Sequence, residues 1–165
     1  MRLKKVILGM ALVVASVSFA QDGAFSVGAS VGLPTGNGAT FNSLTISADA
    51  NYLFEMSDGL NVGAFASYVT FIGKTVGGIK FPSSAWLPLG GAARYNVSDE
   101  FVLGADLGYA IGISPSGQKG GVYYRPMVGY NISDTMQITA SFSGISANGG
   151  SATNFGVGIM YALGK

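Results

Sequence analysis

The chain has 165 residues and a formal net charge of +1, and only 10% of its residues are charged, against about 25% in a typical soluble domain. It contains no cysteine and no histidine, so disulfides and thiolate metal sites are excluded and the commonest general base is missing. Glycine is abundant, with 26 residues. Because so few residues are charged, part of the protein surface is expected to face an apolar solvent.

The first twenty residues predict a secretory signal peptide. Basic residues at the start precede an apolar run from Val6 to Val17, and Ser18-Phe19-Ala20 places small residues at a cleavage site. A spanning helix needs about 20 apolar residues, so the shorter run favours a cleaved signal over an N-terminal anchor helix. We predict cleavage after Ala20, which leaves residues 21–165 as one domain. This domain has six basic and eight acidic residues, and its net charge of −2 excludes a basic surface for nucleic acid.

Eight segments of the remaining chain alternate between apolar and small or polar residues, which is the period of a β-strand. In chain order they are 24–33, 43–54, 60–71, 86–97, 101–113, 121–132, 136–145 and 152–163. One face of these segments is aliphatic or aromatic, whereas the other is mostly Gly, Ser, Thr and Asn, which is too small and polar for a hydrophobic core. The pattern predicts an all-β fold, a closed eight-stranded antiparallel up-and-down transmembrane β-barrel, and disfavours a soluble lipocalin-like barrel.

The connections between these segments alternate in length. Short links at 55–59, 98–100 and 133–135 alternate with longer ones at 34–42, 72–85, 114–120 and 146–151. The longer links contain turn formers, such as Asn37-Gly38 and Asn148-Gly149. Short turns on the periplasmic side and long loops outside are typical of outer-membrane barrels. We therefore expect four extracellular loops and both termini in the periplasm.

Aromatic residues of the apolar face lie near the strand ends, where amphipathic rings meet the headgroup levels of a membrane. Phe101 and Tyr109 are eight residues apart on one strand, which corresponds to a height of roughly 20 Å at a tilt near 40°. The set near the short turns comprises Phe25, Tyr52, Phe54, Tyr95, Phe101, Tyr130 and Tyr161. The set near the long loops comprises Tyr68, Tyr109, Tyr124, Phe142 and Phe155.

The stretches 86–95 (WLPLGGAARY) and 101–109 (FVLGADLGY), followed by Gly129-Tyr130, resemble the central hairpin and a later strand end of a known family. This is the small outer-membrane β-barrel family, which includes opacity-type adhesins and the OmpX and OmpA membrane domains. The resemblance spans the whole mature chain but rests on degenerate patterns. It implies the fold and a location in the bacterial outer membrane rather than an activity.

Two features depart from the pattern of this family. Pro88 and Pro126 lie inside predicted strands, where each removes one ladder donor, and prolines inside strands are found at bulges. The chain also ends in Tyr161-Ala162-Leu163-Gly164-Lys165, where the family usually ends on an aromatic residue. The barrel-assembly machinery is an expected partner, and this ending bears on how it recognises the C-terminus.

Four charged residues point to the small-residue face by parity: Asp49, Arg94, Asp106 and Arg125. Each lies near the middle of its strand, so we expect them to meet as a charge cluster in the barrel interior. An eight-stranded barrel is only wide enough to be filled by its side chains, which favours paired charges that fill it. A gated small pore or proton path is the alternative, because buried charge also occurs in transport proteins.

The longer connections carry the candidate binding residues. Lys74, Lys80, Trp86 and Lys119 are the candidate outer-loop contacts, and the lysines can attract the phosphates of lipopolysaccharide. Ordinary solvated charge is the alternative for these lysines. The second long connection is also apolar, with Phe71, Ile72, Val76, Ile79, Phe81 and Trp86.

An enzyme is disfavoured, because a serine nucleophile in this chain has no histidine to activate it. We expect Ser141 and Ser143 to be structural, and no residue pattern predicts a metal site or a cofactor. The sequence predicts a monomeric structural or surface-interaction protein of the outer membrane, with a polar filled interior. Its partners are lipid, lipopolysaccharide and an extracellular ligand of the loops, and a narrow porin-like channel is the alternative function.

Overall fold

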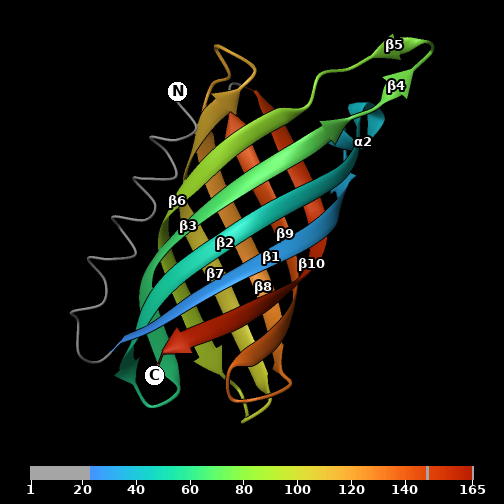
Figure 1. The fold of residues 1–165 in the computed structure, drawn as a ribbon. Coiled ribbons are helices and arrows are strands. Elements are labelled where there is room, and N and C mark those ends of the chain that lie inside the picture. Colours follow the sequence, from blue (N-terminus) through green and yellow to red (C-terminus); the bar gives the residue numbers. More distant parts are fainter. Residues whose placement is uncertain (1–22, 148, 165) are drawn as a thin grey trace.

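The computed structural model describes residues 23–147 and 149–164, so the predicted signal peptide, residues 1–20, lies outside the described residues. Eight long strands close into a barrel in the order β1-β10-β9-β8-β7-β6-β3-β2, and all neighbours are antiparallel (Figure 1). This confirms the predicted fold class. The bounds are β1 Gly23–Thr35, β2 Asn42–Ser57, β3 Leu60–Gly73, β6 Ser84–Asn96, β7 Phe101–Ser114, β8 Gly121–Asn131, β9 Met136–Ala147 and β10 Gly150–Gly164.

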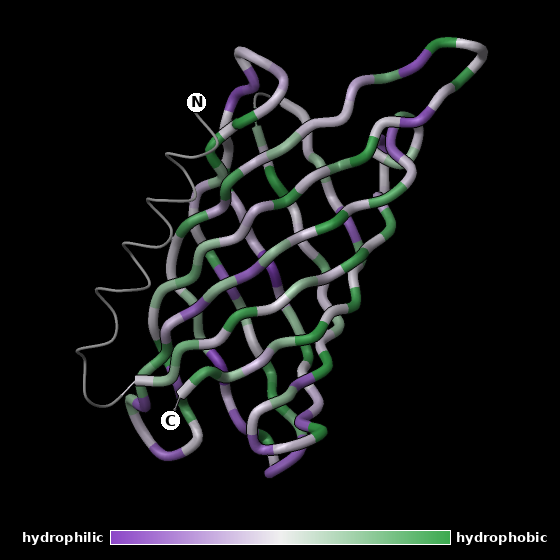
Figure 2. The backbone as a smooth tube through the Cα atoms, in the orientation of Figure 1, coloured by the Kyte–Doolittle hydropathy of each residue, from purple (hydrophilic) through white to green (hydrophobic). Residues whose placement is uncertain are grey.

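The side-chain alternation has the predicted sense. Leu107 and Tyr109 on β7 are 65% and 55% exposed, whereas Asp106, which precedes Leu107, and Ala110, which follows Tyr109, are buried inside the barrel. Figure 2 shows hydrophobic and hydrophilic residues alternating along the strands. The outer wall is therefore the apolar surface, as expected for a barrel whose solvent is lipid.

One end of the barrel, here called the tight-turn end, holds the three short connections. The β2–β3 turn is Asp58-Gly59, in which Gly59 has a φ of 75°, a conformation that glycine adopts without steric cost. In the other two turns a serine caps the backbone: Ser98 Oγ accepts hydrogen bonds from the N–H groups of residues 100 and 101, and Ser133 Oγ from those of residues 135 and 136. Residues 23 and 164 lie at this same end (Figure 1).

The opposite, long-loop end carries additional short elements. Helix α2 (Gly38–Phe41) follows β1, and the hairpin formed by β4 (Thr75–Val76) and β5 (Ile79–Lys80) extends beyond the rim between β3 and β6 (Figure 1). The rings of Phe41 and Phe81 lie 4.7 Å apart and join these two connections. In the described part of the chain, no helix is long and apolar enough to cross a membrane.

The prediction of a fourth long connection at 146–151 is wrong. Ala147 pairs with Gly150, so β9 and β10 continue into a tight hairpin and no long loop joins them. The Asn148-Gly149 pair that indicated a loop is the sequence preferred in two-residue hairpin turns, and Gly149 has a φ of 78°. Among the described residues, three long connections, not four, therefore lie at this end.

Neither Pro88 nor Pro126 produces a bulge. Pro88 and Pro126 both stay in register with β7, opposite Ala110 and Ala105. On their other sides the ladder is interrupted: pairing of β6 with β3, and of β8 with β9, stops at the proline and then resumes in the same register. Each proline therefore costs local pairing with one neighbour without shifting the strands.

Candidate functional site

The structure brings together the four charged residues predicted to share the interior. Asp106 Oδ1 accepts a hydrogen bond from Arg94 Nη1 at 2.7 Å, and Asp106 Oδ2 lies 2.7 Å from Arg125 Nε and 2.6 Å from Arg125 Nη2. Arg125 Nη1 also donates to Asp49 Oδ1 at 2.5 Å. All four residues are at least nine-tenths buried, so the two positive and two negative charges neutralise each other away from water.

The network ties together opposite walls of the barrel. Asp49 lies on β2 and Arg125 on β8, and these strands are four apart in either direction around the eight-stranded sheet. Around Asp49, Ser67 Oγ donates to Oδ1 and Ser47 Oγ donates to Oδ2. Since the hydroxyl hydrogen of Ser47 is committed to Asp49, Ser30 donates to Ser47 in the 2.6 Å contact between the two hydroxyls. The carboxylates are thus saturated by donors from several strands.

Gly104 leaves the space that the side chain of Arg94 occupies in the network. A Cβ at Gly104 would lie 2.6 Å from Cδ of Arg94, closer than real side chains approach each other. The guanidinium group also donates to the carbonyl oxygens of Ala93 and Ala105, at 2.9 and 3.3 Å. Small residues on the inner face therefore make room for the long basic side chains.

The interior on the long-loop side of the network contains a cluster of apolar side chains, which the sequence analysis missed. Large side chains from β3, β6 and β8 pack with smaller ones from β7 and β9, and we call this group the interior apolar cluster. The rings of Phe65 and Tyr123 lie 5.6 Å apart, and those of Phe71 and Trp86 meet edge to face at 5.3 Å. The cluster comprises Phe65, Val69, Phe71, Trp86, Ala92, Ala110, Tyr123 and Ile145.

A second polar chain runs beside this cluster. Ser143 Oγ donates to Asn154 Oδ1, and Asn154 Nδ2 donates to Thr45 Oγ1, both at 2.8 Å. The three residues join β9, β10 and β2 and are all buried. Ser143, expected to be structural, takes part in this hydrogen-bond chain.

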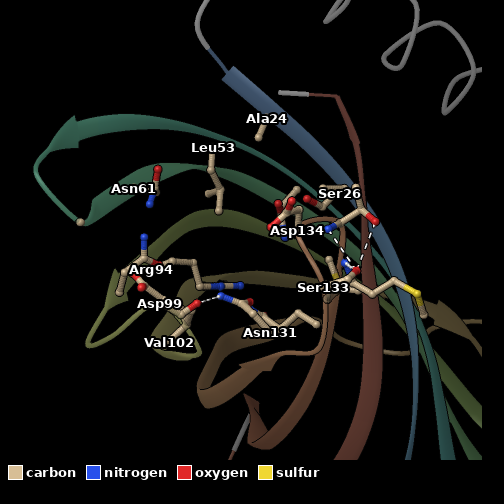
Figure 3. A pocket seen from close by; sticks show the side chains of 18 of the residues that line it. Ala24, Ser26, Leu53, Asn61, Arg94, Asp99, Val102, Asn131, Ser133 and Asp134 are labelled. Carbon is tan, nitrogen blue, oxygen red and sulfur yellow. Dashed lines mark hydrogen bonds between the residues drawn. The ribbon is translucent and has the colours of Figure 1, made fainter.

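The interior on the tight-turn side of the network holds a cavity of about 910 Å³ that opens at that end (Figure 3). Arg94 forms part of its inner boundary, and amide side chains line its wall: Asn51, Asn61, Asn96, Asn131 and Gln137. Four carboxylates lie around it: Glu55, Asp58, Asp99 and Asp134. We call this space the vestibule. A hollow beside the charge network has a volume of only about 10 Å³.

The candidate loop residues are not all placed as expected. Lys80 in β5 and Lys119 are exposed, and Nζ of the half-buried Lys74 donates to the carbonyl oxygen of Ala39 at 2.6 Å. Trp86, by contrast, lies inside the barrel and is 6% exposed, so it has no surface with which to contact an external partner. Phe71 also points inward, because β3 and β6 extend into the segment that was predicted to be a loop. The exposed apolar surface of this connection is provided by Val76 and by Ile79, which is 66% exposed.

Metal binding has no support in these arrangements. Across residues 23–147 and 149–164, no three acidic side chains come close enough to hold a metal ion. The network carboxylates are instead occupied by arginine and serine donors.

Comparison with known proteins shows the fold. No protein-family model and no curated protein matches the sequence. Among solved structures, the chain is similar to Ail, the attachment invasion locus protein of Yersinia pestis, with 16% identity and a TM-score of 0.58 over 86% of this chain and 97% of that one. It is also similar to the N-terminal β-barrel domain of Pseudomonas aeruginosa OprF, with 11% identity and a TM-score of 0.55 over 85% of this chain and 97% of that one.

A de novo designed transmembrane β-barrel is equally similar, with 16% identity and a TM-score of 0.57 over 87% of this chain and 98% of that one. A designed barrel therefore matches as well as natural proteins do. The likeness shows that this chain has the fold of small outer-membrane β-barrels, and its function has to be argued from its own residues.

Proposed function

We propose that this protein is a surface-interaction protein of the outer membrane, whose barrel anchors a long-loop end that binds a polyanionic partner. The shared chemistry of that partner is a dense array of phosphate or sulfate groups, as in lipopolysaccharide or a sulfated glycan. The observation that carries the proposal is the separation of charge along the barrel axis. The exposed charges at the two ends of the barrel are of opposite sign.

Within the described residues, the three lysines, Lys74, Lys80 and Lys119, all lie in connections at the long-loop end. In the same part of the chain, the exposed acidic residues all lie at the tight-turn end: Glu55, Asp58, Asp99, Glu100 and Asp134. The other charged side chains of the described residues are those of the neutral interior network. Such an arrangement attracts anions to one end and repels them from the other.

This polarity supports an orientation in which the long-loop end faces outward. Lipopolysaccharide presents phosphates at the outer surface, so lysines near the outer headgroups are stabilised there. The tight-turn end and both chain ends then face the periplasm. Ail, which has the same fold, has also been solved in complex with the heparin analogue sucrose octasulfate, with 16% identity to this chain and a TM-score of 0.54.

The test replaces the two exposed lysines, because Lys74 also stabilises the α2 connection through its contact with Ala39. In Lys80→Gln/Lys119→Gln we expect binding of the purified barrel to immobilised heparin and to lipopolysaccharide vesicles to fall roughly twofold to thirtyfold at low salt, given about 0.2–1 kcal/mol for each of the two exposed charge contacts. Loss with heparin alone assigns a glycan, and loss with vesicles alone assigns lipopolysaccharide. Glu100→Gln, at the opposite end, is the control. Unchanged binding to both probes in the lysine variant would contradict the proposal.

We also propose that the interior does not conduct, in preference to the porin-like channel. The charge network and the interior apolar cluster support this, since together they occupy the lumen from its middle to its long-loop side. We expect no steady conductance from the purified protein in planar bilayers, and the same for Glu100→Gln. Steady openings that Arg94→Ala or Arg125→Ala enlarges would establish the channel.

Export and assembly complete the proposal. The predicted signal peptide, residues 1–20, and the outward-facing Tyr161 and Leu163 near the C-terminus support secretion followed by insertion through the barrel-assembly machinery. Intact-mass measurement of the protein from outer-membrane fractions should give a chain that begins at Gln21. A retained leader would contradict cleavage.

A further inference from the structure

The vestibule at the tight-turn end is a cavity that the proposed surface function does not use. It is enclosed by residues from all around the barrel, including β1, β2, β3, β6, β7, β8, β9 and β10 (Figure 3). Its volume, about 910 Å³, is in the range of small-molecule sites, which hold roughly 300–1,000 Å³. We propose that the vestibule binds a linear oligoamine, a flexible chain with several separated ammonium groups.

The charges around the vestibule favour a cation. Four carboxylates line it, at Glu55, Asp58, Asp99 and Asp134, and all four are exposed. None of them forms a salt bridge among the described residues. The single cationic side chain among its described lining residues, Arg94, is already paired with Asp106. A concave site lined by one sign of charge concentrates the opposite ion.

A buried acceptor on the wall gives an independent indication of an N–H donor. Asn51 lines the vestibule and is more than nine-tenths buried, yet its Oδ1 accepts no hydrogen bond in the described structure. A buried polar atom without a partner costs about 1–3 kcal/mol. An ammonium group that reached this oxygen would remove that cost, and amide oxygens elsewhere on the wall offer further acceptors.

The spacing of the carboxylates favours an elongated polycation over a metal ion. They lie at three different connections: Glu55 is near the end of β2 and Asp58 is in the β2–β3 turn, whereas Asp99 lies in the β6–β7 turn and Asp134 in the β8–β9 turn. In the described residues no three of them converge on a point that a metal ion could occupy. Charges that are distributed around an opening match a ligand whose charges are distributed along a chain.

The experiment uses spermidine as the probe, titrated calorimetrically into the folded protein in neutral detergent micelles, with butylamine and Mg²⁺ as competitors. We expect saturable binding at one site that weakens as salt increases, because exposed charges are screened. Neither competitor at equal concentration should displace spermidine. Absence of saturable binding at low salt would overturn the proposal, and so would equal displacement by Mg²⁺, which indicates general ion attraction.

Three variants assign the binding to the vestibule. Glu55→Gln/Asp134→Asn should weaken spermidine binding about fivefold, and Asn51→Leu, which removes the buried acceptor at similar volume, roughly threefold to tenfold. Glu100→Gln is the matched control, since Glu100 is exposed in the same turn as Asp99 but does not line the cavity. An equal loss in the control would place the binding outside the vestibule. Gel mobility before and after boiling verifies that each variant is folded.

Discussion

The two halves of the barrel interior are built differently. Towards the long loops, large rings such as Phe71 and Tyr123 fill the space and exclude water. Towards the tight turns, amides and carboxylates surround an open vestibule. The Asp49, Arg94, Asp106 and Arg125 network separates these halves, and its charges are neutralised without help from solvent. The difference teaches that packing and polarity in a small barrel are arranged along its axis as well as across its wall.

The largest effect is expected at the boundary between the halves. Asp106→Ala removes the partner shared by both arginines and leaves two buried guanidinium groups with one carboxylate, so we expect a loss of about 3–5 kcal/mol in the free energy of unfolding. Urea unfolding in lipid vesicles, followed by gel mobility, measures it. A loss below about 1 kcal/mol would show that water reaches the network and that the halves are not separated.

A smaller effect is expected in the filled half. Phe71→Ala deletes a ring that is 2% exposed and packs on Trp86, so we expect a loss of about 3 kcal/mol from lost contacts and a residual cavity. The same unfolding measurement applies, and Trp86 fluorescence reports the local change. If Phe71→Ala were nearly neutral, the long-loop half would not be packed as described.

The buried hydrogen-bond chain beside this cluster provides an intermediate case. Asn154→Ala leaves Thr45 and Ser143 without their partner, and we expect a loss of about 1–2 kcal/mol in unfolding free energy. Thr35→Ala is the control. The hydroxyl of Thr35 contacts the half-buried Thr153 at the loop rim, and we expect its removal to cause a smaller loss in unfolding free energy. Equal losses in the two variants would argue against a special cost of burial at Asn154.

The smallest effect is expected in the open half. Asn61→Ala changes a side chain that lines the vestibule, and we expect a change within about 0.5 kcal/mol because water replaces the amide. A loss comparable to that of Phe71→Ala would mean that the tight-turn half is packed too, and the comparison between the halves would fail.

Most of the fold was predictable from the sequence because strand alternation has a period that a single sequence reveals. The predicted segment 101–113 and the observed strand β7, Phe101–Ser114, differ by one residue. The error at 146–151 came from turn chemistry, since Asn-Gly serves both loops and two-residue hairpins. The placement of Trp86 failed because β6 begins two residues earlier than predicted, at Ser84.

The charge cluster was predictable for the same reason as the strands, because parity places Asp49 and Arg125 on the inner face. The same parity places Phe65, Val69 and Phe71 beside Ser67, so the signal for the interior apolar cluster was present in the sequence. It was missed because the inner face was characterised by its commonest residues. The vestibule depends on side-chain volumes and on how turns meet around the rim, which alternation does not encode.

The most direct test of the central assignment, that the apolar wall faces lipid and the network side faces the lumen, uses the single tryptophan. In vesicles that contain brominated lipids, we predict weak quenching of the native Trp86, which lies inside, and strong quenching of Leu107→Trp in a Trp86→Phe background. Strong quenching of Trp86 together with weak quenching of the Leu107→Trp variant would contradict the account.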